Sequence, residues 1–168
     1  RSYALTSPCS IMVADVKIKA NTIEVSNYLK SILRKTPKAI EQSLNRVSAY
    51  GVKRITEKTQ KGQTPDGGTF KSYADSTKKS RSKRGRQISF VDLTDTGQMF
   101  RSLTWNAKGN KSELFFRRQT ENRKASYHDF FGAGKKKVVR PFFSIGRKDE
   151  IQIQKRFAQH YFRLTGIR

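Results

Sequence analysis

Apolar residues recur at helical spacing in three stretches of the chain, and each stretch predicts an amphipathic helix. The first covers residues 22–35, with Thr22 as its N-cap and Pro37 as its end. The second covers residues 36–59, where the same proline takes the first helical position. The third covers residues 147–164 and closes the chain. The predicted buried faces are, in order, Val25, Tyr28, Leu29 and Ile32; Ile40, Leu44, Val47, Gly51 and Ile55; and Ile153, Phe157, Tyr161 and Leu164.

Strand signals occur in four places. Residues 16–20 alternate apolar with polar side chains and predict a short, half-buried strand. Residues 103–107 and 112–118 predict a hairpin with a short turn and one apolar side. Pro141 holds the residue before it in an extended conformation, so residues 140–145 predict an edge strand that leads into the final helix.

A short helix over residues 97–103 is predicted directly before the hairpin, with Thr96 as its cap. Its apolar side chains share one face, which needs a sheet to pack on. The predicted fold class is therefore α+β: N-terminal helices, one of them long and amphipathic, a small and mainly antiparallel sheet with a short helix, a long basic loop and a C-terminal helix. We expect residues 1–15 to be an N-terminal extension and residues 16–168 to form a single domain.

Periodicity disappears between Lys61 and Arg86, where the chain is polar and strongly basic. A structureless insert of this length is unusual inside a compact domain, so the extended loop, at about residues 61–90, is predicted to be either disordered or ordered by an external partner. Residues 64–68, Thr-Pro-Asp-Gly-Gly, predict a turn within it. Phe70 and Tyr73 are its large anchors, and they could pin the loop to the body or fit into a neighbouring subunit.

The composition points to an anionic partner. The chain of 168 residues carries 36 Lys and Arg against 13 Asp and Glu, a formal net charge of +23. Like charges at this density repel one another and favour a polyanion or an acidic protein surface. Only 35% of the residues are hydrophobic, so we expect segments that gain their order from neighbouring subunits. Cys9 is the only cysteine, which leaves no intramolecular disulfide or cysteine-based zinc site and favours assembly in the cytoplasm.

Four segments in order carry a resemblance to a known family. They are residues 66–73 (Asp-Gly-Gly-Thr-Phe-Lys-Ser-Tyr), residues 93–103 (Leu-Thr-Asp-Thr-Gly-Gln-Met-Phe-Arg-Ser-Leu), Tyr127 followed by Phe131-Gly132, and residues 140–145 (Arg-Pro-Phe-Phe-Ser-Ile). Together with the preceding helix, the pattern resembles the tail-completion or virion-morphogenesis proteins of tailed bacteriophages, over roughly residues 37–164. The chain departs from that pattern at His128, where the family usually has a small residue.

The resemblance implies a structural virion protein without catalysis or cofactor, made in the host cytoplasm and located in the tail or neck. Such a protein forms a ring of six subunits, with twelve as the alternative, at the head-proximal end of the tail. The ring lies between connector or head-completion proteins and the tail tube, and genomic DNA passes through its lumen. The residues expected to contact neighbouring subunits or neck proteins are Phe70, Tyr73, Lys78, Lys79, Arg81, Arg84, Arg140 and Phe142. Those expected to face DNA in the lumen are Lys135, Lys136 and Lys137.

The alternative function is a basic nucleic-acid-binding module. Basic residues interleaved with Tyr73, Phe115, Phe116 and Tyr127 could contact phosphates and stack on bases. Against this alternative, the sequence shows no zinc spacing, no Gly-x-x-Gly clamp on a suitable helix and no aromatic strand signature of a nucleic-acid-binding fold.

An enzyme is the weakest of the three interpretations. His128 and Asp129 are adjacent and would point apart in a strand, and His160 lies on a helix beside the apolar face. Two scattered histidines offer too few ligands for a metal site. Residues 132–135, Gly-Ala-Gly-Lys, lack the spacing and the following Ser or Thr of a phosphate-binding loop and predict a turn between strands. We therefore expect no catalytic residue, metal or cofactor.

Overall fold

The computed structural model describes residues 22–134 and 136–167. Its fold is α+β, as the sequence predicts: the long helix α1 (Thr22–Gln60), a two-stranded antiparallel sheet, short helices and the C-terminal helix α5 (Arg147–Thr165). The predicted strand at residues 16–20 and the predicted N-terminal extension lie outside the described residues.

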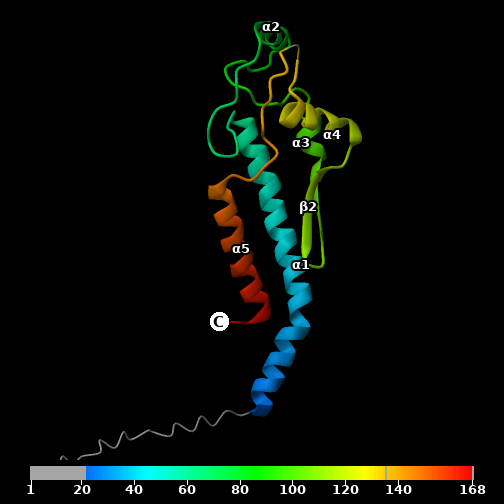
Figure 1. The fold of residues 1–168 in the computed structure, drawn as a ribbon, viewed down its shortest axis with the longest axis vertical. Helices are drawn as coiled ribbons and strands as arrows, with labels where there is room; N and C mark the ends of the chain where they lie inside the picture. The colour runs from blue at the N-terminus through cyan, green and yellow to red at the C-terminus, as the bar shows by residue number, and fades with distance from the viewer. Residues whose placement is uncertain (1–21, 135, 168) are drawn as a thin grey trace, which may run out of the picture.

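Helix α1 forms the spine of the molecule (Figure 1). Helix α5 runs antiparallel along one side of it, and the hairpin of β1 (Leu103–Lys108) and β2 (Lys111–Phe116) lies along the other. The hairpin approaches the backbone of α1 at Gly51, which lies on the predicted apolar face of this helix. A Cβ atom at Gly51 would meet the Leu114 side chain at 3.5 Å, so the hairpin packs directly on the backbone of α1.

The first turn of α5 is tied to α1 by a buried carboxylate. Asp149 is 5% exposed, accepts a hydrogen bond from Arg54 Nε at 2.9 Å and forms an ion pair with Lys58. The predicted inner face of α5 is half-buried, and the rings of Phe157 and Tyr161 on it stack with centroids 6.1 Å apart.

The prediction that Pro37 separates two helices is wrong, because α1 continues through it. Proline lacks the N–H that would bond to the carbonyl of Leu33, at a cost of about 3 kcal/mol in a helix interior. Next to this break, the Thr36 hydroxyl donates to Ile32 O at 2.9 Å and lies 3.3 Å from the hydroxyl of Tyr161 in α5. These contacts do not replace the bond to Leu33 O, but they link this part of α1 to α5.

The hairpin confirms its prediction, including the turn at Gly109-Asn110, where Gly109 takes a φ of 61°. Residues 140–145, however, form no strand, so that prediction is wrong. The amides of Phe142 and Phe143 donate to Asp129 Oδ1 at 2.7 and 2.9 Å. Because a carboxylate takes up these donors, the segment needs no neighbouring strand to satisfy them.

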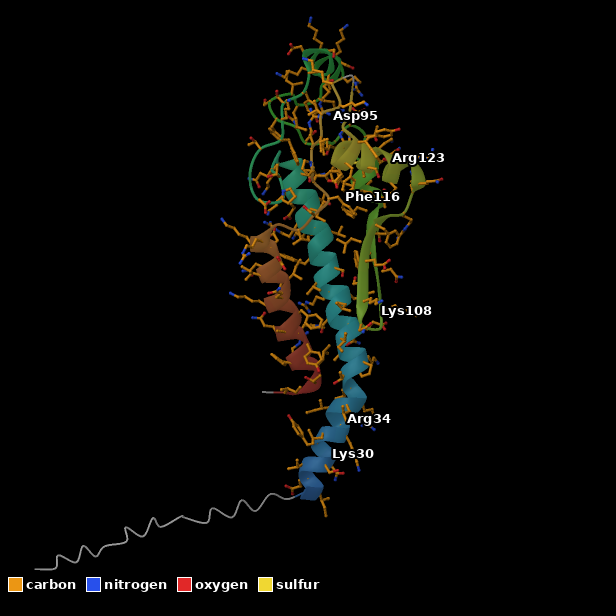
Figure 2. The ribbon with its side chains drawn as sticks, in the orientation of Figure 1. Lys30, Arg34, Asp95, Lys108, Phe116 and Arg123 are labelled. Carbon is orange, nitrogen blue, oxygen red and sulfur yellow. The ribbon has the colours of Figure 1, made fainter. Side chains whose placement is uncertain are left out.

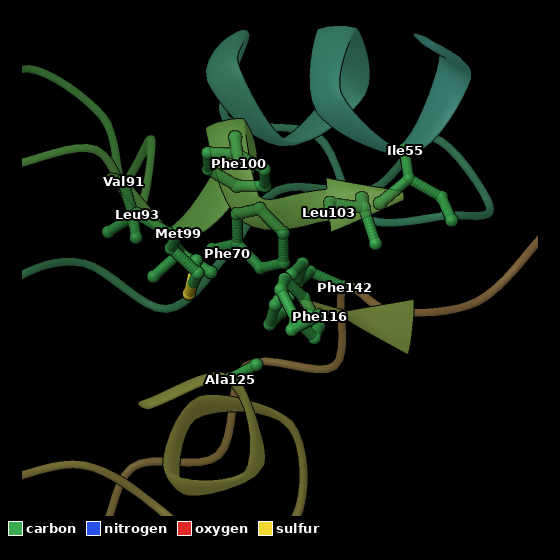
Figure 3. Close-up of a cluster of buried hydrophobic side chains, with 10 residues drawn as sticks. All are labelled: Ile55, Phe70, Val91, Leu93, Met99, Phe100, Leu103, Phe116, Ala125 and Phe142. Atoms are coloured by element: carbon green, nitrogen blue, oxygen red, sulfur yellow. The ribbon is translucent and has the colours of Figure 1, made fainter. Parts of the chain in front are cut away.

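The hydrophobic core lies where the C-terminal half of α1 meets the hairpin and the short helix α3 (Gln98–Ser102) (Figure 3). The predicted apolar face of α3 is confirmed, and its start is one residue later than predicted: Gly97, with a φ of 73°, is the N-cap, while Thr96 accepts only a long, 3.5 Å bond from Gln98 N. The buried core residues are Ile55, Phe70, Val91, Leu93, Met99, Phe100, Leu103, Phe116, Ala125 and Phe142.

Two helical segments were not predicted. The prediction that the basic loop is disordered or ordered by an external partner is wrong, because the loop contains α2 (Asp75–Lys83), whose Arg81 bonds to Asp92 of the same chain. The turn predicted within the loop is confirmed by the bond from Thr64 N to Gly68 O at 2.8 Å. After the hairpin, α4 (Gln119–Ser126) continues into one π-helical turn, η1 (Tyr127–Phe131). His128 and Asp129 therefore lie in a helical turn and not in the strand that the sequence indicated.

Candidate assembly surfaces

A single buried arginine organises the basic loop at the tip of the molecule. Helix α2 carries no large apolar side chain, so apolar packing cannot hold it in place. Its Arg81 is 4% exposed and donates to both carboxylate oxygens of Asp92, to Gln87 O and to Thr94 O at distances between 2.9 and 3.2 Å. These bonds fasten α2 to the segment that leads into α3.

Tyr73 joins this cluster to the rest of the body. Two guanidinium groups lie close to its ring, with Arg81 Cζ at 4.7 Å and Arg140 Cζ at 5.7 Å from the ring centroid. Its hydroxyl donates to Asp92 Oδ1 at 3.0 Å. Burial, reinforced by the negative charge of Asp92, raises the pKa of Tyr73 to about 12. The ring is therefore an uncharged, fixed link between the loop and residue 140.

Arg140 and Asp129 bring together three of the four segments that carry the family resemblance. Arg140 is 6% exposed and donates to Lys71 O at 2.9 Å and to Ser72 O at 3.0 Å, while its own amide donates to His128 O at 2.7 Å. Burial lowers the pKa of this guanidinium. Residues 70–73, η1 and residues 140–143 thus meet at one junction, which fixes the geometry of this end of the molecule.

Four of the residues predicted to contact neighbours lie inside the body of the chain: Phe70, Arg81, Arg140 and Phe142. Of the two roles open for Phe70, the structure favours anchoring the loop, because that side chain is part of the core. Contact of these four residues with another subunit stays a prediction.

The remaining predicted contacts lie closer to solvent. Tyr73 and Lys78 are half-buried, and Lys79, Arg84, Lys136 and Lys137 are exposed. Arg84 is partly neutralised, because its Nη1 lies 2.7 Å from both oxygens of Asp95. Lys135 lies outside the described residues.

Sequence reasoning missed an aromatic and basic surface on α4 and η1. Three neighbouring aromatic side chains are 58–70% exposed, and two of them, Tyr127 and Phe131, make an edge contact with centroids 6.1 Å apart. Beside them lies an open cavity of about 550 Å³. Its lining includes Lys137 and Arg123 of α4, the second of which is labelled in Figure 2. The run Phe130-Phe131 was the available signal, but in the sequence analysis Phe131 entered only as part of the family resemblance.

The second uncovered surface is the free end of α1, which projects past the C-terminal end of α5 (Figure 1). This segment, residues 22–35, carries apolar side chains that stay about half exposed or more: Ile23, Val25, Tyr28, Leu29 and Leu33. Lys30 and Arg34 also project from it (Figure 2). The helical spacing predicted here is confirmed, but within the described residues the expected buried face is largely without cover.

The described part of the chain shows neither a metal site nor a membrane span. It contains no group of three or more His, Cys, Asp or Glu residues that could hold a metal ion. None of its helices combines the length and the apolar character needed to cross a membrane.

The chain matches a protein-family model but no individual known protein. No curated protein and no solved structure matches the chain. The family model described as the phage virion morphogenesis family matches residues 20–161, a span that runs from the free end of α1 to the last turns of α5 and includes the whole junction around Arg140. The chain therefore belongs to the phage virion morphogenesis family, and its role is in the structure or assembly of a bacteriophage virion.

Proposed function

We propose that the protein forms a homo-oligomeric ring, of six or of twelve copies, at the head-proximal end of the phage tail. In this position it completes the tail tube and joins it to the connector or head-completion proteins, and genomic DNA passes through its lumen. Membership of the virion morphogenesis family supports a role in virion assembly. The layer of the neck and the ring itself are part of the proposal.

The observation that carries the proposal is the uncovered end of α1. An isolated helix of about 14 residues is marginal in water, and an exposed apolar face of this kind marks an interaction surface. Ile23 and Leu33 are more than 70% exposed. A second copy of the chain supplies suitable cover, because the projecting end of α1 can reach past its own body to the body of a neighbour. A ring closes when each copy makes this same heterologous contact with the next.

The positive net charge makes this assembly depend on ionic strength. Each copy carries a formal charge of +23, so identical copies repel one another at low ionic strength. Burial of the α1 faces provides the attraction, and salt, DNA or an acidic neck protein reduces the repulsion. We therefore expect rings to form more readily at moderate salt, or with duplex DNA, than at low salt without DNA.

The test is the mass of the full chain, measured by native mass spectrometry and light scattering at several salt concentrations, with and without isolated tails. The informative variant is Leu29→Gln with Leu33→Gln, because glutamine keeps a high helix propensity while it removes the apolar face. We expect rings from the wild-type chain and folded monomers from this variant. The control, Ile151→Gln, changes a 43% exposed apolar residue of α5 and should still form rings.

Two results would overturn the proposal. One is a wild-type protein that stays monomeric at every salt concentration, with DNA and in the presence of tails. The other is wild-type assembly into rings that never associate with a tail or a connector, which would remove the assignment to the neck.

A further inference from the structure

Three arginines gather on facing surfaces of α1 and α5, away from the core and from the aromatic surface. Arg46 of α1 and Arg156 and Arg163 of α5 line one open cavity of about 190 Å³, together with Gln159 and His160. No carboxylate lines the cavity, and within the described residues none of the ion pairs involves these three arginines. Three guanidinium groups therefore share a small space without a negative charge.

Two side chains of the cavity, Arg156 and His160, are held by contacts with α1 that leave the arginine charge available. Arg156 Cζ lies 4.4 Å from the centroid of the Tyr50 ring of α1, a cation–π contact that orients the side chain without neutralising it. His160 Nδ1 lies 3.1 Å from the hydroxyl of Ser43, which is fully buried. The site is thus built across two packed helices, and its two walls are joined by both contacts.

We infer that this cavity binds a phosphate oxyanion. Guanidinium groups match the geometry of phosphate oxygens and donate two parallel hydrogen bonds to them, and Gln159 adds a neutral amide donor at the rim. The cavity is smaller than the pockets of ~300–1,000 Å³ that enclose whole small molecules. It therefore accepts one phosphate group, either inorganic phosphate or a phosphodiester of a DNA backbone that passes along the outside of the helix pair.

The inference does not depend on ring formation, because both helices belong to one chain. It also differs from the predicted DNA contacts at residues 135–137, of which the described Lys136 and Lys137 follow η1 in the chain and belong to neither helix of the pair. An anion at the cavity removes the repulsion among Arg46, Arg156 and Arg163, so binding should also strengthen the contact between α1 and α5.

The pKa of His160 can report whether an anion binds in this cavity. Burial, followed by the positive charges of Arg163 and Arg46, lowers the pKa of His160. The side chains that face this imidazole are Ser43 and Arg46 from α1 and Arg156 and Arg163 from its own helix. A bound phosphate would oppose the arginine charges and raise the pKa of His160. The second histidine, His128, lies in η1 beside Arg140 and should not respond.

The experiment follows both histidine rings of the full chain by NMR during pH titrations in chloride and in phosphate buffers of equal ionic strength, and then with a short DNA duplex. A rise in the pKa of His160 alone in phosphate supports the site, and the same rise with the duplex identifies DNA as the source. A rise with inorganic phosphate alone identifies free phosphate. An unchanged pKa of His160 under both conditions, or equal shifts of both histidines, overturns the inference.

Matched variants give a second measurement. Arg46→Gln with Arg163→Gln should abolish the phosphate-dependent shift of His160. Lys78→Gln with Lys79→Gln removes the same charge from α2 and should leave the shift intact. In duplex binding measured against salt, loss of one phosphate contact per chain lowers the slope of log K against log salt by about 0.9. The site is contradicted if the phosphate-dependent shift survives in the arginine variant.

Discussion

The guanidinium of Arg81 donates to both carboxylate oxygens of Asp92, at 3.0 and 3.2 Å, and both side chains are largely buried. Residues 61–86 contain eight basic residues, and this arginine is the one of them that is buried. Its remaining donors bind the carbonyls of Gln87 and Thr94. The polar helix α2 is therefore held by a hydrogen-bonded charge pair, and the other cations around it stay available to solvent or to partners.

Replacement of Arg81 by alanine should release α2 from the body. The change leaves the buried carboxylate of Asp92 without its cation, and loss of one partner of a buried pair costs about 3–5 kcal/mol. We expect a loss near the lower end of that range, because Tyr73 and the amide of Thr94 still donate to Asp92. Urea unfolding measures the stability, and hydrogen exchange of residues 75–83 measures the release of α2.

Arg84→Ala is the matched control for this prediction. Arg84 and Asp95 form an ion pair of similar length, but both side chains are about half exposed, and exposed pairs contribute about 0–1 kcal/mol. Equal destabilisation by the two alanine variants, or unchanged exchange in α2 after loss of Arg81, would contradict the anchoring role.

Local spacing was sufficient to predict the elements whose hydrogen bonds and apolar faces depend on residues close in sequence. The second half of α1, the hairpin and α5 belong to this group. The strand predicted at residues 140–145 failed for the opposite reason: the amides of Phe142 and Phe143 bind Asp129, which lies 13 and 14 residues earlier in the chain. The contact of α1 with Tyr161 next to Pro37 likewise joins residues that lie far apart in sequence.

The candidate surfaces also depend on contacts between residues that are distant in sequence. Composition predicted an anionic partner, but it could not separate Arg81, which is buried by Asp92, from Lys79, which is exposed. The cluster of Arg46, Arg156 and Arg163 was invisible in the sequence because more than one hundred residues separate its two helical walls. Only the antiparallel packing of α1 and α5 brings these arginines together.

Asp129 should be important for stability, although the sequence singled it out only as a neighbour of His128. Asp129→Ala leaves the amides of Phe142 and Phe143 without their acceptor, and an unsatisfied buried donor costs about 1–3 kcal/mol. Asp129→Asn keeps an acceptor oxygen and removes the charge, so we expect a smaller loss. Denaturant unfolding ranks the variants, and exchange of the two amides reports the local effect.

Glu113→Gln provides the comparison for Asp129, because Glu113 is an exposed carboxylate on β2. It should change the free energy of unfolding by no more than about 0.5 kcal/mol. An equally small loss in Asp129→Ala would mean that the two amides find another acceptor. The conclusion that Asp129 of η1 holds residues 142–143 in place would then be wrong.

Tyr73 should titrate at about pH 12, above the ordinary value of 10.0. Because the pKa is raised in the folded state, the unfolded chain loses this proton first, so the contribution to stability is complete below pH 10 and is lost as the pH rises towards 12. The difference in near-ultraviolet absorbance between wild type and Tyr73→Phe isolates this group from the other five tyrosines. An ionisation at the ordinary value would show that the ring is not buried beside Arg81 and Arg140.

Acidification should weaken the fold through His128 before the carboxylates are protonated. The Nδ1 atom of His128 is buried without a hydrogen-bond partner, and burial, followed by the charge of Arg140, lowers the pKa of the ring below 6.5. The unfolded chain then binds the proton more readily, so the stabilising contribution is complete above pH 6.5 and is lost as the pH falls below that value.

The measurement that checks this is the free energy of unfolding from pH 7.5 to about 5, above the ordinary carboxylate range of about 4. Because the pKa of His160 is also lowered, the wild-type slope contains two histidine contributions. His128→Gln should remove one of them and leave a shallower slope, while His160→Gln removes the other.

Since protonation of His128 adds a positive charge beside that of Arg140, the weakening should be largest at the junction of η1 with residues 140–143. Acid-induced exchange that begins elsewhere, with an unchanged slope in His128→Gln, would rule out this histidine as the source.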